Sequence, residues 1–269
     1  MTKKLFKYFG KWNIAIEVMP IVILACVFKI LTHNNSWEIL SLSPLFTSIL
    51  AATTFLIGFL ITGVISDYKE SEKIPGDLAA SLEVIHDETS QIAMTKQSKE
   101  AKAFLLFQLD FISSLKRWFF KREETGKIFD KLNSMNNHFA KLEAQTQVAY
   151  ISRMKQEQSN IRKMVSRINT LRDTQFAATA YAIAEFLAFF LVVGMITVKI
   201  EPFYESMFFL IIVTFLVWYM ILLIKDFDNP FEYAGHGEQG SEISLKPIHD
   251  LEKRLERYVK EMEKAAKKA

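Results

Sequence analysis

Four long runs of apolar residues dominate the hydrophobic pattern of the chain. They cover residues 13–31, 45–66, 176–198 and 206–224, and the second and fourth runs contain no charged residue. Each run is long enough for a helix that crosses the ~30 Å hydrocarbon core of a bilayer at about 1.5 Å per residue. A soluble protein of this size has no core that could bury four helices apolar on every side. The pattern therefore predicts four transmembrane helices.

The basic residues outside these runs predict the orientation of the chain. Residues 33–44 carry no Lys or Arg, and residues 199–205 carry one Lys against two Glu. The N-terminus, residues 67–175 and the tail after the fourth run are rich in Lys and Arg. Because basic segments stay on the cytoplasmic side, we expect both termini and residues 67–175 in the cytoplasm, and the spans in the cell (inner) membrane. The short connections make the first and second spans antiparallel neighbours, as they do the third and fourth.

The segments outside the spans predict a cytoplasmic body of long helices. Residues 67–175 contain only two Gly and one Pro, and Pro75 is expected to open one helix. A second helix is expected over residues 96–122. A third is expected to start after Gly126 and to continue as one rod into the third span. A stripe of its residues alternates by four and three, the period of a coiled-coil seam: Ile128, Leu132, Met135, Phe139, Leu142, Thr146 and Ala149. Such a rod must pack on another helix of the chain or on a second subunit, and its length and the polar His138 face favour assembly. A final amphipathic helix is expected over residues 248–262.

An aromatic–basic cluster near the end of the second cytoplasmic helix has two interpretations. Trp118, Phe119 and Phe120 adjoin Lys and Arg residues on both sides. Such a cluster can rest at a lipid interface or pack within the helical body.

These elements give an all-α fold class, a multi-pass membrane protein with four transmembrane helices and a long-helix cytoplasmic body. The expected division of the chain has four parts. Residues 1–68 hold the N-terminal segment and the first two spans, and residues 69–175 form the cytoplasmic helical region. Residues 176–225 hold the last two spans, and residues 226–269 form a cytoplasmic tail.

Composition and charge exclude several classes of function. The net charge of +3 is too small to indicate a nucleic-acid partner. The single cysteine, Cys26, excludes an intrachain disulfide, and the five histidines have no metal-ligand spacing. The chain has no phosphate-binding glycine loop and no nucleophile motif. We therefore expect no enzyme, cofactor or metal, and membrane lipid as a partner.

A stripe of six residues on the second span could carry a function. Helical spacing of three and four places on one side Ser48, Ala51 or Ala52, Phe55, Phe59, Thr62 and Ser66. Small residues at such positions often mark a packing face between helices. The other interpretation is the wall of a pore, in which two phenylalanine rings form a hydrophobic constriction that gates by dewetting.

Three short motifs resemble the bestrophin family in their order and spacing. Residues 55–59 (FLIGF), followed by a charged run and Pro75, are similar to the second span and pore neck of bestrophins. Residues 168–172 (INTLR) are similar to the approach to the third span, and residues 228–231 (DNPF) to the motif after the fourth. With the four-span layout, the resemblance extends over most of the chain.

The resemblance implies a homopentameric channel for small inorganic ions, with the second span around the axis. It implies that Phe55 and Phe59 form the neck, with Ala51 one turn outward and Ser48, Thr62 and Ser66 lining the pore. Ala51 departs from the large apolar residue usual there. Most characterised members pass chloride or other small anions, while some bacterial relatives favour monovalent cations. The acidic cluster needed for a calcium clasp does not follow Phe231, so calcium gating is not expected.

Three charged residues lie within predicted spans: Glu17, Lys29 and Glu185. Glu17, near the start of the first span, is expected at the membrane interface. Glu185 is an intramembrane acid of the third span, and such groups are costly enough to indicate function. The alternative is a Glu near the inner interface that is protonated, or paired with Tyr181 or with a basic side chain of a cytoplasmic helix. Lys29 is expected to extend its ammonium group out of the first span.

Two functional hypotheses follow from the sequence. The first is an oligomeric, bestrophin-like ion channel. The second is a membrane-anchored helical scaffold or sensor in which the stripe serves packing alone.

Overall fold

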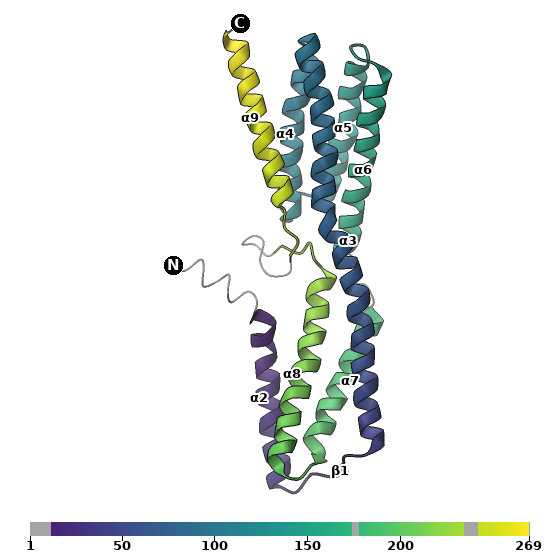
Figure 1. Ribbon diagram of the computed structural model, residues 1–269, viewed down its shortest axis with the longest axis vertical. Helices are drawn as coiled ribbons and strands as arrows, with labels where there is room; N and C mark the ends of the chain where they lie inside the picture. The colour runs from purple at the N-terminus through teal and green to yellow at the C-terminus, as the bar shows by residue number, and fades with distance from the viewer. Residues whose placement is uncertain (1–11, 174–177, 234–241, 269) are drawn as a thin grey trace. The chain divides into compact units, whose positions relative to one another are not determined.

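The computed structural model describes residues 12–173, 178–233 and 242–268 (Figure 1). The first two residues of the predicted third span and the loop at 234–241 therefore lie outside the described residues. Within the described residues the chain forms eight helices and two short strands: α2 (Asn13–Asn34), β1 (Leu40–Ser41), α3 (Pro44–Lys96), α4 (Lys99–Phe119), α5 (Thr125–Glu143), α6 (Val148–Asp173), α7 (Ala178–Thr197), β2 (Val198–Lys199), α8 (Phe203–Asp228) and α9 (Lys246–Lys268). The predicted all-α fold class is confirmed.

Four helices are long and apolar enough to cross a membrane: α2, α3, α7 and α8. Between 22% and 33% of the residues in their most apolar stretches are buried within the chain. The remaining apolar surface suits lipid rather than water. The chain is therefore a multi-pass membrane protein, and the prediction of four spans is confirmed.

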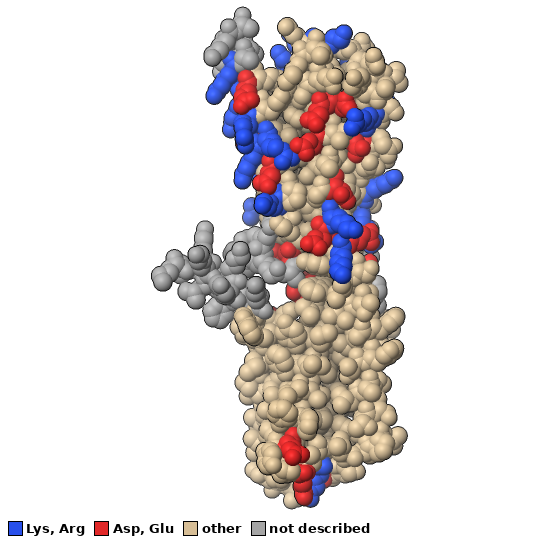
Figure 2. All heavy atoms as spheres, in the orientation of Figure 1, with Lys and Arg blue, Asp and Glu red and all other residues tan. Residues whose placement is uncertain are grey.

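The chain divides into two compact units. The membrane unit comprises residues 1–68 and 175–229, and the helical body comprises residues 69–174 and 230–269. Helix α3 contributes residues 44–68 to the first unit and residues 69–96 to the second. Charged side chains crowd the surface of the helical body, whereas the visible surface of the membrane unit is nearly free of them except at one end (Figure 2).

In the membrane unit, α2 packs mainly on α8 and also on α7, and α7 packs on α8 (Figure 1). The expected pairing of the first span with the second is thus not the main contact of α2. At one end, called here the hairpin end, the two short connections meet in a parallel pairing of β1 with β2. Leu40 is paired with Val198, and Ser41 with Lys199. The core of the unit includes side chains from all four helices, among them Ala25, Leu60, Leu191 and Leu210.

The helical body contains a helix pair where the sequence predicted one rod. Helix α5 ends at Glu143 and α6 starts at Val148, so the prediction of a continuous helix into the third span is wrong. The chain folds back between them, and α5 packs on α6. The part of the stripe on α5 is fully buried, whereas Thr146 lies between the two helices and Ala149 is exposed on α6. The buried apolar residues of α6 are Ile151, Met154, Ile161, Val165 and Ile168. The rod therefore finds its partner within the same chain.

Pro75 lies inside α3 and does not open a new helix. A proline in a helix interior removes one backbone hydrogen bond and disfavours the helix by about 3 kcal/mol. Ile74 and Leu78, on either side of it, are 7% and 0% exposed. Their burial in the helical body opposes this local cost, and the helix continues.

The aromatic–basic cluster packs within the helical body, which resolves the two interpretations. Trp118 and Phe119 are 1% and 0% exposed. The guanidinium group of Arg172 lies 4.5 Å from the centre of the Trp118 ring, and its Nη2 donates to the carbonyl of Phe119 at 2.9 Å. Arg172 therefore closes the end of α4 and holds the end of α6 against it.

Candidate functional site

The first half of α3 has a buried face and an exposed face. The buried face enters the core of the membrane unit through Thr53, Ile57, Leu60 and Val64. The other face carries the six residues predicted to line a pore, and all six are exposed: Ser48, Ala51, Phe55, Phe59, Thr62 and Ser66. We call these six residues the α3 stripe. The rings of Phe55 and Phe59 are 77% and 68% exposed, so the bundle of a single copy does not cover them.

Two hydroxyl groups of the α3 stripe donate hydrogen bonds to backbone carbonyls of the same helix. Ser48 Oγ donates to the carbonyl of Pro44 at 2.8 Å, and Thr62 Oγ1 donates to the carbonyl of Gly58 at 2.8 Å. Such bonds to the preceding turn satisfy a hydroxyl group without water. The stripe can therefore carry these polar groups beside apolar rings within a membrane.

The exposed face of α3 differs in composition from those of the other three spans. Large apolar residues dominate the exposed faces of α2, α7 and α8, among them Ile23, Phe28, Phe186, Phe190, Phe208 and Leu216. On α3, Leu45 and Ile49 are exposed near the hairpin end, but from Ala51 to Ser66 the exposed residues other than the two phenylalanines are small or bear a hydroxyl group. Lipid tails favour the first kind of surface, whereas small residues allow another helix or water to approach.

Glu185 lies on α7 and is partly exposed, and its carboxylate forms an ion pair with Lys225 of α8. Lys225 lies near the end of α8, so the partner is a basic side chain from a neighbouring span rather than from a cytoplasmic helix. A functional role of Glu185 beyond this pairing stays a prediction.

Sequence reasoning missed a polar cluster at the hairpin end of the membrane unit. Lys29 is fully buried, and its Nζ lies 2.8 Å from Glu38 Oε1 and donates to the carbonyl of Val198 at 2.5 Å. Glu38 Oε2 lies 3.1 Å from His33 Nδ1. The expectation that Lys29 extends out of the span is wrong, because the connection folds back and supplies a carboxylate. Glu38 is the only acid in residues 33–44, and this isolation is the signal that could have found it.

The electrostatics of Glu38 follow from this cluster. Burial by itself raises the pKa of a carboxyl group. The hydrogen bonds and positive charges of Lys29 and His33 act in the opposite direction, and the pKa of Glu38 lies below its usual range. Glu38 is therefore a carboxylate over the physiological pH range.

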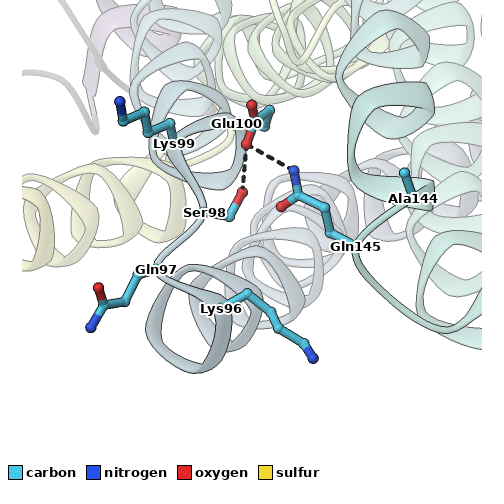
Figure 3. A pocket seen from close by; sticks show the side chains of 7 residues that line it. All are labelled: Lys96, Gln97, Ser98, Lys99, Glu100, Ala144 and Gln145. Carbon is cyan, nitrogen blue, oxygen red and sulfur yellow. Dashed lines mark hydrogen bonds between the residues drawn. The ribbon is translucent and has the colours of Figure 1, made fainter.

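An open polar pocket lies in the helical body, where α3 ends and α4 begins (Figure 3). Its lining residues are Lys96, Gln97, Ser98, Lys99, Glu100, Ala144 and Gln145. Glu100 accepts hydrogen bonds from Gln145 at 2.8 Å and Ser98 at 3.1 Å, and these bonds lower its pKa (Figure 3). The Glu100 carboxylate thus lies in the first turn of α4, where the helix dipole favours a negative charge. In the described part of the chain, no group of three or more His, Cys, Asp or Glu residues could hold a metal ion.

Comparison with known proteins gives similarity in structure but not in sequence. No protein-family model matches the chain, and no curated protein matches it significantly. A bacterial bestrophin homologue from Klebsiella pneumoniae, solved by zinc phasing, superimposes with a TM-score of 0.74 at 13% identity. This match covers 91% of this chain and 98% of the other. A single-residue variant of the Klebsiella pneumoniae homologue gives a TM-score of 0.75 at 13% identity, covering 90% and 99%. The resemblance found in the sequence is confirmed at the level of architecture: the chain has the fold of bacterial bestrophin homologues.

Proposed function

We propose that this chain forms an oligomeric, bestrophin-like ion channel whose pore is lined by the α3 stripe. In this proposal Phe55 and Phe59 form the neck, Ala51 lies one turn outward, and Ser48, Thr62 and Ser66 line the wider parts. The observation that carries it is the exposed face of α3, where small and hydroxyl residues surround two uncovered rings. The large apolar residues of the other spans form a surface suited to lipid.

A pore requires several copies of the chain, because one helix cannot enclose a water column. Copies arranged around a common axis would cover the α3 stripe and bring the phenylalanine rings together. A ring of apolar side chains narrows the water column and gates by dewetting. The resemblance to bestrophins suggests five copies, with small monovalent ions as the permeant species and chloride as the first ion to test.

The distribution of basic residues supports an orientation for this channel. Lys and Arg are rare in residues 33–44 and 199–205 and frequent in residues 67–175. The helical body and both termini are therefore proposed to lie in the cytoplasm, and the spans in the cell membrane.

Ion flux into liposomes tests the proposal. Wild-type protein should conduct, and the Phe55→Ala, Phe59→Ala double variant should conduct several-fold faster or gate more loosely, because the apolar constriction is removed. The matched control is Phe186→Ala with Phe190→Ala. These two phenylalanines also lie four residues apart, on α7, and are 61% and 51% exposed. The control should leave the flux unchanged.

Two results would contradict the proposal. One is the absence of flux from both the wild type and the neck variant in well-reconstituted protein. The other is an equal change in flux from the α7 control, because the effect would then come from the membrane unit as a whole. Reversal potentials in chloride and potassium gradients give the sign of the permeant ion.

A further inference from the structure

The polar cluster at the hairpin end joins α2 and the connection that follows it to a segment about 160 residues further along the chain. Lys29 on α2 contacts Glu38 in the connection between α2 and α3, called here the first connection. It also contacts the carbonyl of Val198 in the connection between α7 and α8, called here the second connection. Thr32, one turn further along α2, donates through Oγ1 to the carbonyl of Ile196 at 3.0 Å. The imidazole ring of His33, which contacts Glu38, stacks on Phe203 at a centroid distance of 4.2 Å. We call Lys29, Thr32, His33 and Glu38 the hairpin cluster.

The burial of this cluster makes the position of each partner matter. The Lys29 side chain is 0% exposed and that of Glu38 is 8% exposed. A buried charge is tolerated only when an opposite charge and hydrogen bonds compensate for lost hydration. Lys29 obtains both, one from each connection, so moving either connection away would remove one of the two interactions that compensate a buried ammonium group.

The hairpin cluster lies a few residues before the start of α3. Glu38 is followed by β1, which pairs with β2, and then by Ser43, whose Oγ accepts a hydrogen bond from the backbone of Phe46 at 3.3 Å. Helix α3 begins at Pro44. The segment from Glu38 to Pro44 is therefore fixed at one end by a buried ion pair and at Leu40 and Ser41 by strand pairing.

We propose that Lys29 and Glu38 act as positioning residues, which fix the first turn of α3 and hence the place of the α3 stripe. The first half of this statement concerns the hairpin end alone. The second half, that ion flow depends on this position, rests on the proposed function.

Four variants test the first half by hydrogen–deuterium exchange on the full chain in nanodiscs. They are Lys29→Met, Glu38→Gln, the double variant with both changes, and a control that combines Lys199→Met with Glu201→Gln. The control removes the ion pair between Lys199 and Glu201 in the second connection, whose two atoms lie 2.7 Å apart. The side chains of this pair are 58% and 75% exposed. Pairs that exposed contribute little to stability.

The single changes should accelerate exchange in residues 36–43 and 196–201 by roughly tenfold or more. Glu38→Gln leaves the buried Lys29 ammonium group without an opposite charge, and Lys29→Met leaves the Glu38 carboxylate with His33 but without its ammonium partner. The control should exchange like the wild type. The double variant has no uncompensated buried charge, so its thermal stability should recover toward wild type. Its exchange at both connections should stay fast, because the bonds of Lys29 to Glu38 and Val198 are still missing. If Lys29 and Glu38 only stabilised the fold, the double variant would recover both the thermal stability and the slow exchange of the wild type.

Flux measurements on the same samples test the second half. The stable double variant should show altered flux, whereas the control should not. Wild-type exchange in the double variant would overturn the proposal, as would unprotected amides at residues 36–43 in the wild type itself. Fast exchange with wild-type flux would overturn the link to α3. If the wild type conducts no ions at all, the proposed function fails, while the exchange experiment still decides whether the hairpin cluster holds the connections.

Discussion

His86 shows how burial changes the chemistry of a single side chain in the helical body. It is 6% exposed, with Nε2 3.2 Å from Ser90 Oγ and its ring edge-on to Tyr258 at 5.0 Å. Burial lowers the pKa of His86 below its usual value, although the nearby carboxylates Asp87 and Glu83 act in the opposite direction. The neutral imidazole is therefore the form that the folded body accommodates.

This lowered pKa predicts a loss of stability in acid. The unfolded chain binds a proton on His86 near pH 6.5, its usual value, while the folded chain resists protonation. The stability of the body should therefore be full above this pH and should fall as the pH drops below it, by up to about 1.4 kcal/mol per pH unit for one histidine. His138, whose pKa burial also lowers, acts in the same direction.

Thermal unfolding of the full chain between pH 8 and pH 5 checks this prediction. The unfolding temperature of the variant with His86→Gln and His138→Gln should depend less on pH over this interval than that of the wild type. An unchanged pH dependence would show that other groups control the acid response.

At the scale of elements, α7 approaches the start of α3 closely at Gly194. A Cβ atom at this position would lie 2.7 Å from Cε2 of Phe46, which is itself 9% exposed. Phe46 belongs to the first turns of α3, so the end of α7 and the start of α3 pack with no room for a methyl group. The glycine thus serves close helix packing in the membrane unit.

Gly194→Ala should therefore destabilise the membrane unit, by about 1–3 kcal/mol as an overpacking change. In an open position the same change favours a helix by up to about 1 kcal/mol. Gly76→Ala is the matched control, because a Cβ there meets nothing within 4 Å. Thermal unfolding compares the two variants, and adding Phe46→Leu to Gly194→Ala should recover part of the loss. Equal behaviour of the two alanine variants would contradict the close packing.

At the scale of the whole molecule, the two units are built for different surroundings. The membrane unit presents apolar helix faces, whereas the helical body presents charged groups (Figure 2). The α3 stripe is the surface that fits neither description, since small and hydroxyl residues surround its two rings. A covering of this surface by further copies of the chain is the arrangement that the proposed channel requires.

The mass of the assembly in nanodiscs tests this requirement. Five copies are expected, and the Phe55→Ala, Phe59→Ala variant should keep the same mass, because in the proposed channel the rings narrow the pore without holding the copies together. A monomer or dimer would favour the scaffold or sensor hypothesis.

The sequence by itself determined which segments meet lipid and the class of the fold. Hydrophobicity is a local property, so runs of apolar residues identified all four spans, and helical spacing placed the six residues of the α3 stripe on one side. The amphipathic period likewise predicted α9. Short motifs were sufficient to indicate the bestrophin fold because their order follows the order of the helices.

Only the tertiary structure decided which distant segments meet. It paired α5 with α6, buried Trp118 in the body, and continued α3 through Pro75, where packing outweighs local preference. It also brought Glu38 to Lys29 and Lys225 to Glu185. The energy of a buried charge depends on the partner that the fold places beside it, and no pattern along the chain records that placement.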